Sequence, residues 1–111
     1  MIYVCKLLAR NGINCIVSLI SPYRNVREYA RKQFPKFIEV YCKCSLQECI
    51  RRDPKGLYKK ALAGEITNMT GIQDPYEEPV NPEVVIDTEH DSISYNVGKI
   101  LNKLIELGYL K

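Results

Sequence analysis

Ser21 and Arg24 are two residues whose types and spacing could do chemistry together. Ser21 follows a nearly continuous apolar run, residues 14–20, and Asn25 with Glu28 predicts a helix just after it. A serine between a strand and a helix lies near free backbone amides and the positive end of the helix dipole, which favour an anion. The planar guanidinium of Arg24 suits phosphate or sulfate better than a lysine would. The competing interpretation is that Ser-Pro merely ends a strand and that Arg24 is a solvated helix residue.

A second candidate is the cationic segment between residues 51 and 60. Against the single Asp53 it carries five basic side chains, Arg51, Arg52, Lys55, Lys59 and Lys60. Such a density attracts polyphosphates, and a cationic lid can neutralise charge that develops on a transferring phosphoryl group. A charge run can also be a solvated face, or a stripe that binds nucleic acid. Because Tyr58 is the single aromatic residue in the segment, we expect no nucleic-acid partner.

The cysteine and histidine content predicts neither a disulfide framework nor a metal site. The five cysteines are an odd number scattered through apolar segments, which favours reduced, buried thiols and a cytoplasmic protein. The single histidine, His90, is remote from Cys42 and Cys44, and its neighbours Asp91 and Ser92 are explained more simply as a helix cap. No apolar run approaches the ~20 residues that cross a bilayer, so we expect no membrane segment.

Three apolar runs predict strands, at residues 14–20, 37–42 and 84–87. The first is expected to be covered on both faces, as in a parallel sheet. Strands that alternate with helices imply parallel pairing and a layered α/β domain, in which ligands collect at the carboxyl ends of the strands.

Periodic segments predict four to five helices between and after these strands. In the second helix, which the pair Asn25 and Glu28 would cap, Val26, Tyr29 and Ala30 are expected to face inward. Ser45 is expected to cap the third helix. The helices are expected at residues 2–8, 25–34, 46–50, 55–62 and 93–105. Residues 64–82 show no sustained periodicity, and a stretch of that length without regular structure is usually functional or disordered.

Four stretches, taken in order, carry a resemblance to a known family. They are Ile20-Ser21-Pro22-Tyr23-Arg24, Arg52-Asp53-Pro54-Lys55-Gly56-Leu57-Tyr58-Lys59-Lys60-Ala61, Thr70-Gly71-Ile72 and Pro75-Tyr76-Glu77. Together they resemble the substrate-binding half of adenylylsulfate kinases (APS kinases). That family transfers the γ-phosphate of ATP to the 3′-hydroxyl of adenosine 5′-phosphosulfate and so forms 3′-phosphoadenylyl sulfate in sulfate assimilation.

The resemblance implies roles for individual residues on the acceptor side. Ile20 and Ser21 would contact the sulfonucleotide, and Ser21 would be the catalytic residue, since the family's serine is commonly assigned as a phosphoserine intermediate. Arg24 and Lys55 would also bind the substrate. Asn68 and Met69 stand where the family has Gly-Phe, whose ring stacks on the adenine, so a thioether would cover the base here.

The resemblance also implies two contacts on the nucleotide side, Arg52 and, near a position that contacts ATP, Asp91. We expect the hydroxyl of Ser21 and the cationic segment around Lys55 to converge on one nucleotide.

The implied fold is a three-layer, P-loop-kinase-like parallel sheet that is incomplete, with about three strands, because the N-terminal strands are missing. No G-x-x-x-x-G-K-S/T phosphate loop occurs, and the resemblance covers about the last three-fifths of the family's domain. We therefore expect residues 1–111 to be one partial APS kinase domain, with residues 52–82 as lid and substrate loop.

The partners implied by the resemblance are adenosine 5′-phosphosulfate and ATP with Mg²⁺, although the chain shows no ligand set for the metal. In the parent protein the resemblance also implies a homodimer or a fusion with a sulfurylase. The alternative is a non-catalytic remnant that binds a sulfonucleotide or a partner kinase chain.

Overall fold

The structure, a computed structural model that describes residues 1–110, contains five helices and two strands in this part of the chain. In chain order they are α1 (Ile2–Arg10), α2 (Arg24–Lys32), β1 (Val40–Lys43), α3 (Leu46–Arg52), α4 (Leu57–Leu62), β2 (Val84–Asp87) and α5 (Ile93–Glu106). The order of helices and strands is the one expected from the sequence, apart from the first strand. No helix among these residues is long and apolar enough to cross a membrane.

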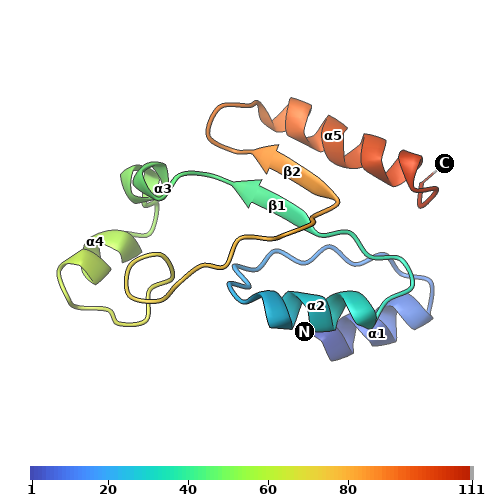
Figure 1. Ribbon diagram of the computed structural model, residues 1–111, viewed down its shortest axis with the longest axis horizontal. Helices are drawn as coiled ribbons and strands as arrows, with labels where there is room; N and C mark the ends of the chain where they lie inside the picture. The colour runs from blue at the N-terminus through green and yellow to red at the C-terminus, as the bar shows by residue number, and fades with distance from the viewer. Residues whose placement is uncertain (111) are drawn as a thin grey trace.

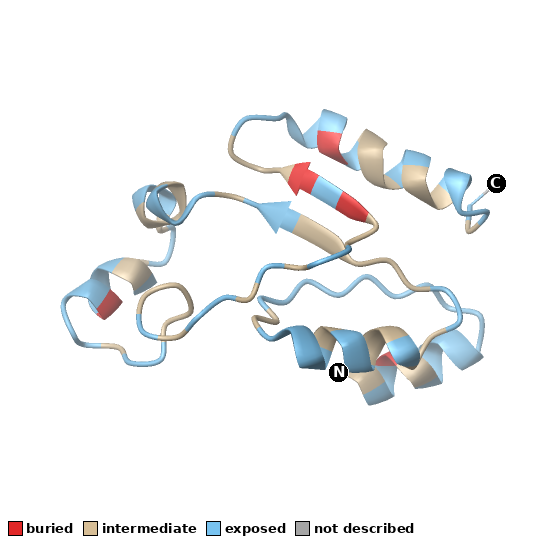
Figure 2. Cartoon of the chain, viewed as in Figure 1, coloured by how far each residue is buried: buried red, intermediate tan, exposed pale blue. Residues whose placement is uncertain are grey.

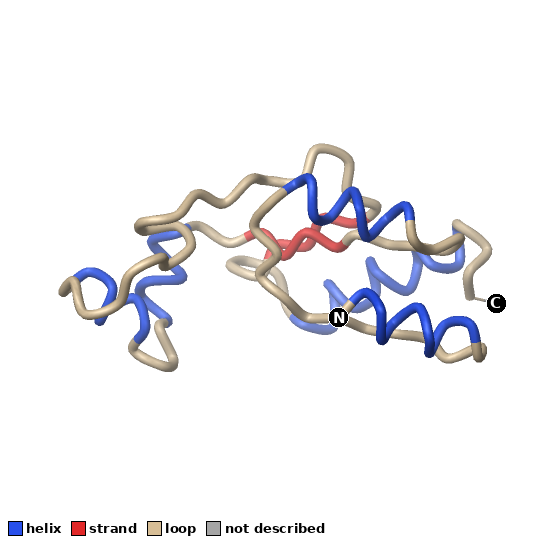
Figure 3. Tube along the Cα trace, turned by 90° about the horizontal axis from the view of Figure 1, so that it is seen from below, coloured by secondary structure: helices blue, strands red, loops and turns tan. Residues whose placement is uncertain are grey.

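The two strands form a parallel pair, as predicted. Val40 lies opposite Val84, and the register continues to Lys43 opposite Asp87. Val84 and Ile86, which share one face of β2, are both buried. In Figure 1, α1 and α2 lie below the strands and α5 lies above them, and the perpendicular view in Figure 3 shows helices on both sides of the strands. The arrangement is therefore a small layered α/β fold.

Helix α5 packs on β2 and is held there by polar contacts at its start. The hydroxyl of Ser92 accepts from the amide of Tyr95 at 3.1 Å, which confirms the expected cap. The buried Asn96 donates its side-chain amide to the carbonyl of Asp87 at 2.9 Å, which ties α5 to the end of β2. Gly108, at φ 74°, follows the last turn and ends the helix as predicted.

Helix α2 is bound to the strands by arginines, contrary to the prediction that Val26 and Tyr29 face inward. The guanidinium of Arg31 makes two hydrogen bonds to Glu83, at 2.7 and 3.0 Å, while Val26 and Tyr29 are 48% and 59% exposed. The predicted Asn25 cap is also wrong, because the helix begins at Arg24 and its cap residue is Tyr23.

Residues 14–20 form no strand, which corrects the prediction for this segment. They run in the same direction as β1 and β2 (Figure 1), yet the sheet consists of β1 and β2 alone among the described residues. All seven residues are exposed, Ile16 to 99%. A strand needs a neighbour that pairs with its amides and carbonyls, and none of the described residues supplies one.

Few residues are buried, and they lie in separate parts of the molecule (Figure 2). The buried apolar residues are Cys5, Ala61, Val84 and Ile86. The radius of gyration is 15.9 Å, against about 13 Å for a compact domain of this size. One cause is visible in both views: α3, α4 and the loop that follows them stand apart from the strands (Figures 1 and 3).

Replacing Ser92 with alanine should destabilise α5 and the sheet that it covers. The change removes the hydroxyl that accepts from the amide of Tyr95, and loss of such a cap costs about 1 kcal/mol. Ser94→Ala is the matched control, because Ser94 lies inside the first turn of α5 and caps nothing. Urea unfolding followed by circular dichroism should show a lower midpoint for S92A alone; equal midpoints for both variants would contradict this.

Candidate functional site

The predicted site lies at the edge of the fold where the carboxyl ends of the strands point. Segment 13–20, β1 and β2 run in one direction (Figure 1), so Ser21, Ser45 and Asp91 all follow the same edge. Asp91 lies in the turn after β2, exposed, and its amide donates to the carbonyl of Asp87 at 3.3 Å. Ligands in open parallel sheets bind at this edge.

Ser21 has a backbone conformation that serine rarely adopts. Its φ is 42°, in the left-handed region, and the residue is half-buried. The surrounding turn is held by two hydrogen bonds, from the guanidinium of Arg27 to the carbonyl of Ser21 at 2.6 Å and from the amide of Glu77 to the carbonyl of Pro22 at 2.9 Å. Such conformations persist only where the surroundings over-determine them, and they cluster at functional sites.

Arg24 begins α2 and is anchored on one side. Its backbone amide donates to the carboxylate of Glu77 at 3.0 Å, and its Nε donates to the carbonyl of Glu78 at 2.7 Å. Neither terminal nitrogen of this exposed guanidinium has a hydrogen-bond partner within residues 1–110. These two nitrogens are therefore free to bind an oxyanion.

Asn68 and Met69 lie in the irregular loop 64–82, which is hydrogen-bonded to α4. Asn68 has φ 62°, and the amide of Met69 donates to the side chain of Gln73 at 2.8 Å. Gln73 in turn donates to the carbonyl of Ala61, in α4, at 3.3 Å. Because the same loop reaches the Ser21 turn through Glu77, one segment connects the two halves of the predicted site.

Two of the five basic residues in the cationic segment 51–60 are neutralised by an acidic partner. Glu48 accepts from Arg51 at 2.6 Å and from Arg52 at 2.7 Å. The hydrogen bond from Arg51 has the largest effect on the pKa of Glu48. Together with the hydrogen bond from Arg52 and the charge of both arginines, it lowers this pKa to about 2. Lys55 forms no ion pair with any described residue and is exposed to solvent. Arg52, the predicted nucleotide contact, is thus already engaged, and Lys55 is not.

Asp53 fixes the start of the short helix α4. Its two carboxylate oxygens accept from the amides of Tyr58 and Lys59, each at 3.0 Å. Helix α4 therefore begins at Leu57, two residues later than predicted, with Lys55 in the turn before it.

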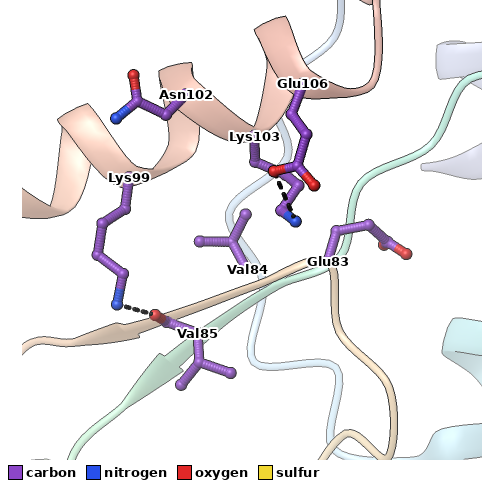
Figure 4. A pocket seen from close by; sticks show the side chains of 7 residues that line it. All are labelled: Glu83, Val84, Val85, Lys99, Asn102, Lys103 and Glu106. Carbon is purple, nitrogen blue, oxygen red and sulfur yellow. Dashed lines mark hydrogen bonds and ion pairs between the residues drawn. The ribbon is translucent and has the colours of Figure 1, made fainter.

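Neither of two surface cavities in the described structure contains a predicted site residue. The larger, of about 390 Å³, lies between β2 and α5, where Lys99 and Lys103 point toward the strand (Figure 4). The smaller is lined by one face of α1. The convergence of Ser21 and Lys55 on one nucleotide therefore stays a prediction.

The described residues do not offer a metal site. Within residues 1–110, no group of three or more histidine, cysteine, aspartate or glutamate side chains is placed to hold an ion. All five cysteines are free thiols.

Sequence reasoning missed Arg27, Gln73 and Asp53 as residues that shape the site. Arg27 and Gln73 act through backbone carbonyls far away in the sequence, which no local pattern reveals. Asp53 carries a signal in the sequence, because an acidic residue shortly before a basic helix can cap it.

Replacing Asp53 with alanine should loosen the start of α4. The amides of Tyr58 and Lys59 lose their acceptors, and a lost cap costs about 0.5–2 kcal/mol. Amide hydrogen exchange, read by NMR, should accelerate at these two residues. Glu65→Ala removes the same charge from a residue that caps nothing, and similar acceleration in that control would contradict the assignment.

Replacing Arg51 with glutamine should raise the pKa of Glu48 from about 2 toward its ordinary 4.5. Because the folded-state pKa is the lower one, the ion pair stabilises the fold fully above pH 4.5 and loses this effect as the pH falls toward 2. An NMR titration of the Glu48 carboxyl carbon measures the midpoint. Arg10→Gln, on α1, should leave it unchanged, and an unchanged midpoint in R51Q would contradict the pairing.

Known proteins resemble this chain over nearly its whole length. The family model for adenylylsulphate kinase matches residues 1–87. A probable adenylyl-sulfate kinase of Pyrococcus abyssi is 52% identical over 110 residues, which are 99% of this chain and 63% of that protein. A probable bifunctional SAT/APS kinase of Sorangium cellulosum is 54% identical over 108 residues, 97% of this chain and 19% of that protein.

A solved structure shows the same fold. The APS kinase CysC of Mycobacterium tuberculosis, in complex with AMPPNP and APS, superposes with a TM-score of 0.88 at 42% identity, over 94% of this chain and 62% of that chain. The chain thus spans about three-fifths of the length of the single-function relatives that it matches. With the sequence motifs, the fold and the matched residues in agreement, the chain belongs to the adenylylsulphate kinase family.

Proposed function

We propose that this chain forms the acceptor side of an adenylylsulfate kinase, the side that binds adenosine 5′-phosphosulfate and presents its 3′-hydroxyl to the γ-phosphate of ATP. The observation that carries the proposal is the turn at Ser21, a half-buried serine with φ 42° at the carboxyl edge of the fold, immediately before α2. The relative from Mycobacterium tuberculosis was solved with AMPPNP and APS bound, which supports both nucleotides as ligands.

Ser21 and Arg24 are assigned to the anionic end of the sulfonucleotide. The hydroxyl of Ser21 has no hydrogen-bond partner within residues 1–110, and the terminal nitrogens of Arg24 are also unengaged. Both groups stand at the start of α2, where the positive end of the helix dipole favours an anion. The first amide of the helix, that of Arg24, is itself bound to the carboxylate of Glu77. Ser21 is the candidate catalytic residue, and Ile20, which is 66% exposed beside it, would shape the pocket.

Residues 52–82 are assigned as lid and substrate loop. Lys55 supplies a free cation, Met69 with Asn68 covers the base, and Arg52 with Asp91 contacts ATP. A cation that closes on a phosphate group in a site with little water stabilises the charge that develops during transfer. This loop bonds to α4 through Gln73 and to the Ser21 turn through Glu77. These bonds support the assignment, because a movement of the lid would be passed on to the Ser21 turn.

The ATP side of the reaction needs groups that the printed sequence does not contain. No G-x-x-x-x-G-K-S/T loop occurs, and the described residues do not supply an Mg²⁺ site. Mg²⁺ in such kinases is held largely by the phosphates and by water, with few protein ligands. A cytoplasmic location, which the free thiols favour, and a homodimer or a sulfurylase fusion belong to the same proposal for the whole protein.

Replacing Lys55 with alanine should weaken the binding of adenosine 5′-phosphosulfate about 10- to 100-fold, the effect of losing one charged hydrogen bond. Isothermal titration of the chain with this nucleotide measures the dissociation constant. Lys32→Ala is the matched control, because Lys32 is also an exposed lysine and lies at the far end of α2 from Ser21.

The control should bind as the parent chain does. Absence of binding by the parent chain would contradict the proposed function. Equal weakening in both lysine variants would instead indicate a general charge effect and contradict the assignment of Lys55.

A further inference from the structure

We infer that Arg27 is the positioning residue of the acceptor site, the group that holds the Ser21 turn and the end of the substrate loop in register with each other. The inference rests on the proposed function for its meaning, and on contacts within the chain for its evidence. Arg27 bonds to the backbone carbonyl of Ser21, and its proposed effect on the substrate acts through Ser21.

Every nitrogen of the Arg27 guanidinium has a different partner. One terminal nitrogen donates to the carbonyl of Ser21 at 2.6 Å, the other donates to the carbonyl of Glu77 at 2.5 Å, and Nε pairs with the carboxylate of Glu39 at 3.1 Å. These partners belong to three separate segments, namely the turn before α2, the substrate loop and the residue before β1. A planar fork with several fixed donors is suited to such a junction.

The side chain of Arg27 and that of its partner Glu39 are largely shielded from water. The side chain is 10% exposed and that of Glu39 is 11% exposed. The guanidinium also lies 5.9 Å from the ring centre of Tyr76, which stacks on Tyr41. A buried charge that loses a partner has no water to replace it, so the three bonds are expected to hold together.

The same junction explains how Ser21 keeps its unusual backbone. The left-handed conformation at φ 42° is unfavourable for a serine and needs outside support. The two neighbouring carbonyls, of Ser21 and Pro22, are each bound, by Arg27 and by the amide of Glu77. Because Arg27 also binds the carbonyl of Glu77, it fixes the segment that supplies the second bond.

Arg31, one turn along the same helix, provides a contrast. Its hydrogen bonds and ion pairs go to carboxylates, those of Glu83, Glu39 and Glu28, and its guanidinium lies 5.1 Å from the ring centre of Phe37. No bond from it to the Ser21 turn occurs within residues 1–110. Both arginines hold α2 against the strands, and Arg27 alone reaches the site.

The test compares Arg27→Lys with Arg31→Lys. A lysine keeps the positive charge beside Glu39 but has one nitrogen, so it cannot hold Glu39 and two carbonyls at once. Hydrogen exchange at the amide of Glu77 reports the bond to Pro22 directly and requires no nucleotide. We expect this amide to lose protection in R27K and to keep it in R31K, with similar urea midpoints for the two variants.

The second readout is the affinity for adenosine 5′-phosphosulfate. R27K should bind about 10-fold more weakly than the parent chain, since small displacements of positioning groups have effects of this order or larger, and R31K should bind as the parent does. Unchanged protection at Glu77 in R27K, or equal loss in R31K, would overturn the inference.

The two readouts separate this inference from the proposed function. If the parent chain does not bind the nucleotide, the proposed function fails, and the exchange at Glu77 still decides whether Arg27 positions the turn. If the parent binds and R27K binds equally well, the inference is overturned while the proposed function stands.

Discussion

Helix α2 stays against the strands through partly buried ion pairs, while its apolar residues Val26 and Tyr29 are exposed. Arg31 forms a two-pronged bond with Glu83, and Glu83 also accepts from the amide of Glu39 at 2.7 Å, directly before β1. Guanidinium and carboxylate bonds are directional, so this network sets the rotation of α2 as well as its distance. The Ser21 turn at the head of the helix is held separately, by Arg27.

Local signals were sufficient for much of the fold. Ser45 and Ser92 each accept from an amide three residues later and begin α3 and α5 as predicted. The short apolar run at residues 84–87 forms β2 with the predicted boundaries. These features depend on neighbouring residues, which a sequence displays directly.

Features that depend on distant partners were predicted poorly. Residues 14–20 have the composition of a buried strand. A strand forms only by hydrogen bonding to a neighbouring strand, and the described residues provide no such neighbour for this segment. At the site, the types of Ser21 and Arg24 could be recognised, whereas the bond from Arg27 to Glu77 spans 50 residues and left no local trace. The resemblance to the family includes Pro75-Tyr76-Glu77, but it does not predict that Glu77 bonds to Pro22 and Arg27.

The two edges of the small sheet differ in their capacity to recruit another strand. Alternate residues of a parallel strand direct their main-chain groups to opposite sides, and Val84 bonds to β1, so Val85 faces outward, where Lys99 donates to its carbonyl at 2.7 Å. On β1 the outward groups of Val40 and Cys42 have no such cover among the described residues. Two molecules that joined along β1 would leave the edges that carry Lys99 on both outer sides, and a lysine at an edge disfavours further main-chain pairing.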